Sequence, residues 1–275
     1  MIAKFHLSWQ VIKRPLVVAV IVGIVLVLIV VDCMLYGTGL VGKTLWDWLQ
    51  LAIIPFMLAG GGYVFSQVQK NNDQKIAQDN QQETALQAYI DKMSELLLHE
   101  QLGESSPPDK VVAIAQARTA TVLRILDPAR RASLIQFLSG ANILLVCVKD
   151  SLEGIDLQGA NLARLDLTGI SMKKANLQHA NLRETRLVDT TLDGANLRRA
   201  YLTDADLSKA RLVGADLQGA RLLSTNLGEA KFLGANLKNA NLSYAALHKA
   251  SISQEQLQSA MHLQGAKMPD GSTHS

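Results

Sequence analysis

Residues 195–214 read ANLRRAYLTDADLSKARLVG, and this stretch decides the fold. Leu recurs in it every five residues, and an Ala stands two positions before each Leu. Extended outward, the register holds from Leu152 to Ile252. Of its twenty-one central positions eighteen are Leu, and fourteen of the residues two positions earlier are Ala. No insertion or deletion breaks this register, so it must serve one repeated structure.

A period of five fits neither an α-helix, with its period of 3.6, nor a β-strand, with its period of 2. It fits a coil with four similar sides that each turn the Leu and the small residue inward, so that twenty residues complete one turn. Turns stacked at the strand spacing of about 4.8 Å would make a rod of roughly five turns. The motif resembles the pentapeptide-repeat family. That resemblance implies a right-handed quadrilateral β-helix over residues 150–254, with these two positions in its core.

Two apolar stretches near the N-terminus, 16–36 and 46–65, are long enough to cross the hydrocarbon layer of about 30 Å as helices. The basic residues that flank them, Lys4, Lys13, Arg14, Lys70 and Lys75, outnumber those of the connecting loop, which offers Lys43 offset by Asp47. The positive-inside rule then places both termini and the repeat coil in the cytoplasm. We therefore predict an integral membrane protein with two spans, whose hairpin tethers the coil to the lipid bilayer.

The domain organisation follows from these assignments. We expect a cytoplasmic N-terminus (1–15), a transmembrane hairpin (16–65), a helical connector with the N-terminal cap (66–149), the β-helix (150–254), and a C-terminal cap and tail (255–275). The architecture resembles a membrane-anchored subgroup of pentapeptide-repeat proteins that is common in cyanobacteria.

The sequence pattern of the connector predicts three helical segments. A polar segment follows the second span to Leu102 and carries an apolar stripe. We expect a stalk or docking helix here, with a coiled coil that pairs chains into a homo-oligomer as the alternative. A linker at 103–108 precedes a helix at 109–126. Asp127 and Pro128 then predict the start of a third helix, which ends near Gly140 and caps the exposed end of the coil.

At the other end the repeat register breaks at Gln256. Residues 253–263 are expected to form the C-terminal cap, and the tail from Pro269 is expected to be disordered.

A phosphate-loop motif, GxxxxGK[ST], occurs at Gly37–Thr44 but in the wrong context. Such a loop binds phosphates when it joins a short strand to a helix. Here it joins two long apolar segments, on the side of the membrane away from ATP. We interpret it as a tight turn between two membrane helices and predict no nucleotide or other cofactor.

Charge and residue types exclude several functions. Residues 150–254 contain thirteen Lys and Arg against eleven Asp and Glu, whereas a mimic of DNA needs a dense negative surface. Cys33, Cys147 and the six histidines show no metal-ligand spacing, and no catalytic constellation is recognisable. We predict no enzymatic activity, no bound metal and no nucleic-acid partner.

Two outer columns with a period of twenty are predicted to be structural. They are Asp156, Asn176, Asn196, Asp216, Asn236 and Asn161, Asn181, Tyr201, Arg221, Asn241. Polar side chains stacked in this way stabilise neighbouring strands.

One basic group is a candidate docking patch for an acidic protein or for anionic lipid headgroups, with a merely solvated surface as the alternative. Its members are Lys173, Lys174, His179, Arg183, Arg198 and Arg199.

The sequence therefore predicts a non-catalytic, membrane-tethered scaffold that presents its repeat surface to a cytoplasmic protein. The alternative is an accessory component of a transport or channel assembly. A pore needs polar residues along its spans, and Asp32, Asp47 and Gln50 all lie near one interface, which favours the tether.

Overall fold

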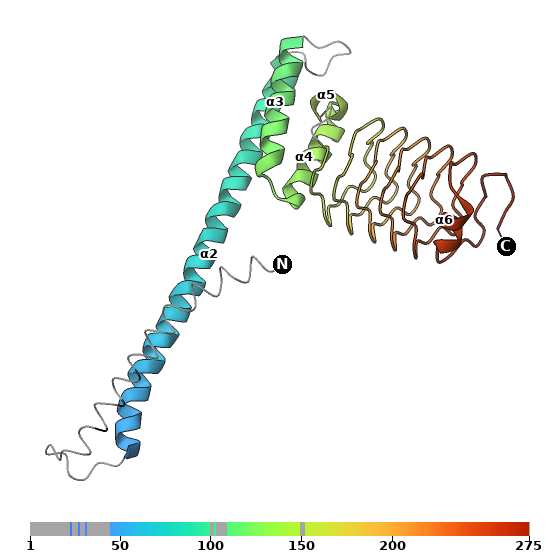
Figure 1. The fold of residues 1–275 in the computed structure, drawn as a ribbon. Helices are drawn as coiled ribbons and strands as arrows, with labels where there is room; N and C mark the ends of the chain where they lie inside the picture. Colours follow the sequence, from blue (N-terminus) through green and yellow to red (C-terminus); the bar gives the residue numbers. More distant parts are fainter. Residues whose placement is uncertain are drawn as a thin grey trace. The chain divides into compact units, whose positions relative to one another are not determined.

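The computed structural model describes residues 23, 27, 31, 45–99, 102, 109–148 and 152–274. Its helices are α2 (Leu45–His99), α3 (Asp109–Ile125), α4 (Pro128–Gly140), α5 (Leu144–Val148) and α6 (Gln254–Ser259). A repeat coil lies between α5 and α6 (Figure 1). The chain divides into two compact units, Met1–Gln78 and Asp79–Ser275, and α2 contributes to both.

The coil has the predicted period. Parallel β-bridges join residues twenty apart, from Asp156↔Asn176 through Lys231↔Ser251, so four sides of five residues complete each turn. Between turns, Leu157 N–H donates to Asn176 C=O over 2.8 Å, and Asn176 N–H donates to Ile155 C=O over 2.8 Å. The turns are visible in Figure 1 as successive loops of similar size. The pentapeptide-repeat β-helix expected from the sequence is therefore the observed architecture of this region.

Each side ends in a corner whose second residue has positive φ. Gly fills this position at some corners, as at Gly194 (φ 66°), and polar residues fill it at others, as at Lys174 (φ 56°) and Arg199 (φ 55°). Polar residues with a Cβ adopt this left-handed conformation at a cost, which the bonds of the neighbouring turns offset. The corner residues point away from the core and carry much of the surface charge.

The core of the coil is formed by the predicted inward positions. The central residues, such as Leu197, Leu202 and Phe232, are completely buried. Three members of the small-residue column are Thr instead of Ala, and their buried hydroxyl groups all find acceptors. Thr185, Thr190 and Thr225 donate to the carbonyls of Leu162, Leu167 and Leu202, each over 2.9 Å. The core therefore tolerates these hydroxyl groups without an unpaired polar atom.

Helix α4 caps the N-terminal end of the coil, as predicted. Asp127 is its N-cap and accepts a hydrogen bond from Arg130 N–H at 2.8 Å. Arg131 Nη1 donates to Asp156 C=O over 2.9 Å, and Gln136 Nε2 donates to Asn161 C=O over 2.7 Å. These side chains satisfy carbonyl groups that have no preceding turn to pair with, which protects the open end of the coil.

Helix α5, which the sequence analysis did not predict, packs against α3 and α4. It buries Leu144, Cys147 and Val148 in the apolar cluster that continues into the coil. Its five residues are too few for a helical period to show in the sequence.

The C-terminal end differs from the prediction. Helix α6 is an insertion, after which the coil resumes with pairs twenty-one residues apart, Asn241↔His262 and Ala246↔Lys267. Gln256 Nε2 donates to Phe232 C=O over 2.6 Å and to Ala235 C=O over 2.8 Å, so it replaces the missing turn at that corner.

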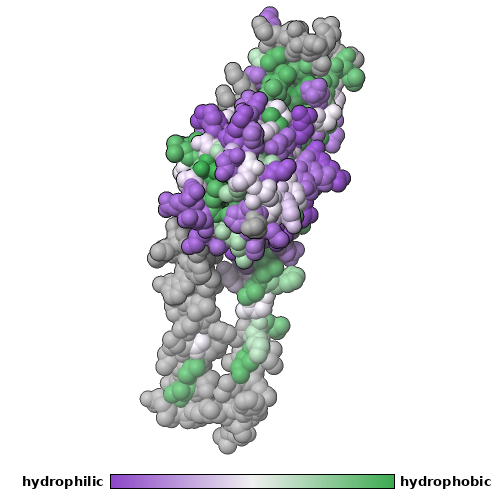
Figure 2. Space-filling view, turned by 90° about the vertical axis from the view of Figure 1, so that its right-hand side faces the viewer, coloured by the Kyte–Doolittle hydropathy of each residue, from purple (hydrophilic) through white to green (hydrophobic). Residues whose placement is uncertain are grey.

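The prediction of a disordered tail from Pro269 is wrong. Lys267 and Thr273 form an antiparallel bridge, and Met268 N–H donates to Ser272 C=O over 2.8 Å. Pro269, Asp270 and Gly271 have the composition of a tight turn, and Gly271 has φ 88°. The turn lets this segment fold back and add hydrogen bonds to the last turn of the coil. Figure 2 views this end and shows mostly hydrophilic residues there.

Helix α2 runs without a break through the boundary predicted at residue 65. In the second unit its later part packs against α3, where Tyr89 Oη lies 2.7 Å from Thr119 Oγ1 in a buried contact. Arg130 reaches it from α4 and pairs with Asp79 at 2.8 Å and Glu83 at 3.0 Å.

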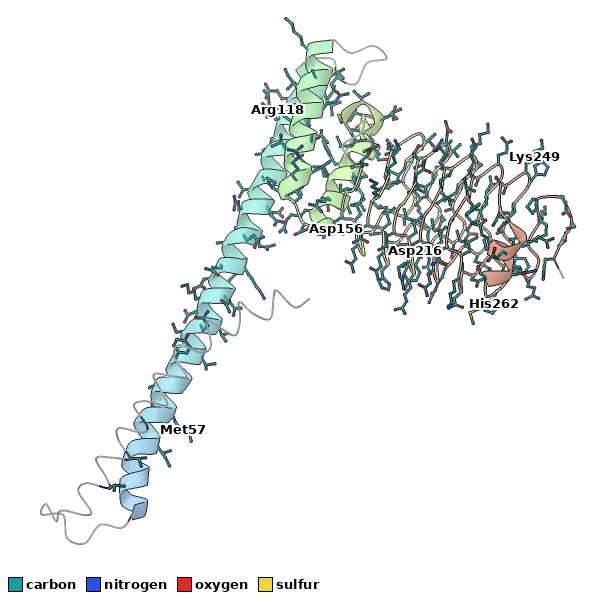
Figure 3. All side chains as sticks on the ribbon, viewed as in Figure 1. Met57, Arg118, Asp156, Asp216, Lys249 and His262 are labelled. Carbon is teal, nitrogen blue, oxygen red and sulfur yellow. The ribbon has the colours of Figure 1, made fainter. Side chains whose placement is uncertain are left out.

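In the first unit α2 exposes large apolar side chains, among them Met57 (72% exposed), Leu58 (71%) and Phe65 (70%). Met57 is labelled in Figure 3. Among the residues that the structure describes, no helix combines the length and the apolar character needed to cross a membrane. The predicted N-terminus 1–15, most of the first span 16–36 and the motif Gly37–Thr44 lie outside the described residues.

Candidate functional site

The six residues of the predicted docking patch lie at three different corners of the coil. His179, Arg198 and Arg199 share one corner in successive turns, where His179 N–H donates to Arg198 C=O over 3.0 Å. Lys173 and Lys174 occupy the preceding corner, below Asp193 and Gly194. Arg183 occupies the following corner. The structure therefore brings His179, Arg198 and Arg199 together. Arg183 lies on the other side of the adjoining face, and Lys173 and Lys174 lie apart from both.

Two of the six charges are already paired. Lys173 Nζ lies 3.5 Å from Glu153 Oε1, and Arg198 Nη1 lies 3.2 Å from Asp216 Oδ2. The pKa of Glu153 is lowered, mainly by a hydrogen bond from Ser171 and then by the charge of Lys173. Pairs this exposed contribute little to stability, but they reduce the charge that these cations offer to a partner.

The face between His179's corner and Arg183's corner carries the column Asn161, Asn181, Tyr201, Arg221 and Asn241. Its first two members form the predicted amide ladder, since Asn181 Nδ2 donates to Asn161 Oδ1 over 2.9 Å. The ladder stops at Tyr201. The guanidinium carbon of Arg221 lies 4.8 Å from the centre of the Tyr201 ring, and that of Arg183 lies 5.5 Å from it. The amide ladder of this column therefore ends at Asn181, and a stack of Arg221 on Tyr201 follows it. The expectation that the column is structural stays a prediction.

The adjacent face has ladder bonds on both sides of a gap between Asn196 and Asp216. Asn176 Nδ2 donates to Asp156 Oδ1 over 2.8 Å, Asn196 Nδ2 to Asn176 Oδ1 over 3.2 Å, and Asn236 Nδ2 to Asp216 Oδ1 over 3.0 Å. Asp156 and Asp216 of this column are labelled in Figure 3. Side chains that bond to one another in this way have few donors and acceptors left for a partner.

A shallow groove of about 380 Å³ lies at the interrupted column. We call it the Tyr201 groove. Its lining contains the three arginines Arg198, Arg199 and Arg221, and it also includes His179, Tyr201 and the amides of Gln218 and Asn239. Tyr201, His179 and Gln218 are half-buried, whereas Arg183, Arg199 and Arg221 are exposed.

The face that contains the groove has an excess of positive charge. In the part of the chain that the structure describes, no carboxylate forms an ion pair with Arg183, Arg199 or Arg221. Arg164 is the contrasting case, because Nε and Nη2 bond to both carboxylate oxygens of Glu184 over 3.0 Å. Three arginines on one face therefore keep their charge available. Guanidinium groups bind carboxylates and phosphates through paired N–H donors.

The sequence analysis missed Tyr201 and Arg221 as site residues. The sequence does mark these two positions, since Tyr201 and Arg221 replace Asn in an otherwise regular column. The period of twenty does not reveal the contact with Arg183, because that contact joins a corner residue to a face residue of the next turn.

A second, more open groove of about 880 Å³ lies between α3 and the first turn of the coil. Small residues such as Ala113, Ala117 and Ala120 line it, together with Arg131. The Arg131 side chain is already used, because its Nε donates to Leu123 C=O over 2.8 Å and its Nη1 to Asp156 C=O. Its lining is mixed. The exposed Arg124 lies there together with Glu153 and Asp156, so acidic residues offset the basic ones in this groove, unlike in the Tyr201 groove.

Reactive chemistry has few candidates in the described chain. Burial raises the pKa of the Cys147 thiol to about 12, so this cysteine stays protonated at neutral pH. Within the described ranges no three His, Cys, Asp or Glu side chains gather closely enough to hold a metal ion. The predicted absence of enzymatic activity stays a prediction. What the Tyr201 groove can do chemically is bind an anion.

Comparison with known proteins supports the assignment of the coil. The family model described as pentapeptide repeats (eight copies) matches the chain three times, over residues 151–187, 185–222 and 219–254. No curated protein sequence matches the chain.

Several solved structures are similar to the coil. One is HetL of Nostoc sp. strain PCC 7120, a pentapeptide repeat protein involved in heterocyst differentiation regulation, with 30% identity and a TM-score of 0.21 over 43% of this chain and 76% of that chain. Another pentapeptide repeat protein of that strain has 32% identity and a TM-score of 0.25, over 39% of this chain and 84% of that one.

QnrB1, described as a plasmid-mediated fluoroquinolone resistance protein, has 21% identity and a TM-score of 0.29, over 41% of this chain. The chain spans 59% of the length of that structure. The family match, the five-residue register and the twenty-residue bridge pattern agree over the same residues. The chain therefore belongs to the pentapeptide-repeat proteins through its coil, residues 151–254.

Proposed function

We propose that the protein is a non-catalytic scaffold, tethered to a membrane by its N-terminal region, whose coil binds a partner protein through the Tyr201 groove. The observation that carries the proposal is the set of exposed arginines, Arg183, Arg199 and Arg221, which have no ion-pair partner among the described residues. A regular coil holds such side chains at fixed positions, because their backbone is bonded to the turns on both sides.

The proposed tether is supported by the sequence and by α2. The apolar stretches at 16–36 and 46–65 have the length of membrane spans, and basic residues flank them on the sides that become cytoplasmic. The exposed apolar side chains of α2, such as Met57 and Phe65, need an apolar environment to cover them. The tether would confine the coil to a membrane surface and so raise the local concentration of a partner there.

Mimicry of DNA is a poor alternative. The face with the groove is basic, which is the opposite of the dense negative charge that such a mimic presents.

The proposal is tested in two independent parts. Reporter fusions at Gln10, at Gly39 and after Ser275 should report cytoplasm, exterior and cytoplasm, and a cytoplasmic signal at Gly39 would overturn the tether. For the scaffold, chemical crosslinking in cells should join the full chain to a partner protein. The same partner should be lost when Arg183, Arg199 and Arg221 are all changed to Gln. Partner capture that is unaffected by this variant would contradict the groove's role.

A further inference from the structure

We infer that the Tyr201 groove recognises an extended, acidic peptide segment of its partner. This inference rests on the proposed scaffold function and adds the chemical class of the ligand. Arg183 lies beside the groove and reaches the ring of Tyr201, whereas Arg199 and Arg221 line the groove itself. Three properties carry the inference: how these arginines are held, how they are spaced, and which uncharged groups lie beside them.

Two of the three arginines are held in place before any ligand arrives. Arg183 and Arg221 come from the turns on either side of Tyr201, and both guanidinium groups stack over its ring. The negative face of the ring attracts the cations and limits their rotamers, while the N–H groups at the guanidinium edges stay free to bind oxygens. An anion that binds here therefore loses less side-chain entropy than one that binds freely moving arginines.

The spacing of the cations suits an extended chain of charges. Arg183, Arg199 and Arg221 lie on three successive turns, and two turn spacings cover about 10 Å. An extended peptide rises about 3.4 Å per residue, so acidic side chains on one side of it recur every 7 Å or so. Two or three alternate carboxylates would span the same length.

The uncharged lining also favours a peptide. In the described chain, the side-chain amides of Gln218 and Asn239 form no hydrogen bond, and each offers both a donor and an acceptor. A peptide backbone needs both. A flat bilayer surface would contact protruding residues first. Tyr201 and His179 are half-buried, so lipid headgroups would reach them less easily than a peptide would. A nucleic-acid base would need an open aromatic face, and the Tyr201 ring is covered by guanidinium groups from both neighbouring turns.

The test is a fluorescence-anisotropy titration of the full chain, kept in solution with a nonionic detergent. The probe is a fluorescein-labelled peptide of eight alternating Glu and Asp residues, and a peptide of Gln and Asn of the same length is the uncharged control. We expect binding of the acidic probe that weakens with added salt, and no binding of the control peptide.

The decisive comparison uses two variants that remove the same charge. Arg183→Gln, Arg199→Gln and Arg221→Gln together should weaken binding of the acidic probe by about 10-fold or more. Lys209→Gln, Lys231→Gln and Lys249→Gln remove three exposed cations from other parts of the coil and should change it by less than about 2-fold. Equal losses in both variants would reduce the effect to net charge and overturn the inference. Unchanged binding by the first variant would overturn it as well.

Tyr201 supplies a second readout. Tyr201→Phe keeps the ring and should bind the probe like the natural chain. Tyr201→Asn restores the residue type of the turn below and should weaken binding several-fold, although all the arginines remain. Equal binding by both variants would contradict the positioning role of the ring.

Competition separates the ligand classes. Water-soluble dihexanoyl-phosphatidylserine and a thymidine oligonucleotide should each displace the probe less readily than unlabelled acidic peptide. If either displaces it more readily, the peptide inference is wrong. The proposed scaffold function is tested separately, because loss of the crosslinked partner in the variant without Arg183, Arg199 and Arg221 would support that function even if the acidic probe does not bind.

Discussion

Two adjacent faces of the coil share one backbone and one core but differ outside. On one face, Asp156, Asn176 and Asn196 bond to one another from turn to turn. On the other, Tyr201 and Arg221 break the ladder and stack together. The difference shows how a repeat protein separates stability from binding. Inward positions fix the fold and ladder residues add to it, and we propose that positions that give up a ladder bond serve to bind a partner.

The largest effect is expected in the core, which both faces share. Leu202 is completely buried below the groove, so Leu202→Asp would place an unpaired carboxylate among leucines, and cooperative unfolding of the coil should be lost. Leu202→Ala should cost about 2–5 kcal/mol. Arg199→Asp, at an exposed corner, should change the free energy of unfolding by less than about 0.5 kcal/mol. Thermal melts followed by circular dichroism measure all three, and similar melts for Leu202→Asp and Arg199→Asp would refute the assignment of inward positions.

The next effect concerns the buried hydroxyl groups of the core. Thr225 Oγ1 donates to Leu202 C=O over 2.9 Å in a fully buried position. Thr225→Val removes the donor and leaves that carbonyl oxygen with one bond fewer, so it should cost about 1–2 kcal/mol. Ala is the usual residue of this column, and Thr225→Ala is the matched variant that also removes volume. A chemical-denaturation curve in which Thr225→Val is as stable as the natural chain would show that the hydrogen bond contributes nothing.

The two faces should respond oppositely to changes in their columns. Asn176→Ala removes the bond to Asp156 and the one from Asn196, so it should destabilise the coil by about 1–2 kcal/mol. Changing Tyr201 and Arg221 together to Asn should extend the neighbouring ladder and stabilise the coil by about 1 kcal/mol. Denaturation and probe titration of the same samples would then show a gain in stability together with a loss of binding. A loss of stability in the double variant would mean that Tyr201 and Arg221 are themselves structural.

The smallest effect is expected from the exposed ion pair beside the groove. The hydrogen bonds from Arg164 lower the pKa of Glu184 below its ordinary value of 4.5. A lowered pKa means that the stabilisation is complete above the ordinary value and is lost as pH falls through the lowered one. Compared with Glu184→Gln, the natural chain should therefore melt slightly higher at pH 7, and this advantage should vanish near pH 3. Glu229→Gln, which removes a carboxylate without an ion pair in the described coil, is the control and should show no such pH dependence. An advantage that grows at low pH would contradict this reading.

The parts of the fold that the sequence predicted well are those governed by a short period. The inward Leu and Ala positions and the bridge pattern follow from a five-residue register that no competing structure satisfies. The cap at Asp127 and Pro128 followed from local helix-start chemistry. The ordered tail beyond Pro269 was not foreseen, because its bonds depend on the last turn of the coil, which resumes after the α6 insertion.

The candidate site was predicted only in part, for a similar reason. A list of basic residues includes His179, Arg183 and Arg199, but composition does not distinguish them from Lys173, which Glu153 neutralises one turn away. Tyr201 and Arg221 become recognisable only when residues twenty and eighteen positions apart are placed side by side. Departures from a repeat's usual residue are therefore a better guide to a binding site than charge alone.

The most direct test of the account is site-specific photocrosslinking of the full chain in cells. A photoreactive amino acid replaces Gln218 in the groove or Asn236 on the ladder face, which are both on the surface of the coil. The account predicts that a partner protein crosslinks at Gln218, that the crosslinked segment is acidic, and that Asn236 gives no such product. A partner that crosslinks at Asn236 and not at Gln218 would contradict the claim that the interrupted column is the binding face.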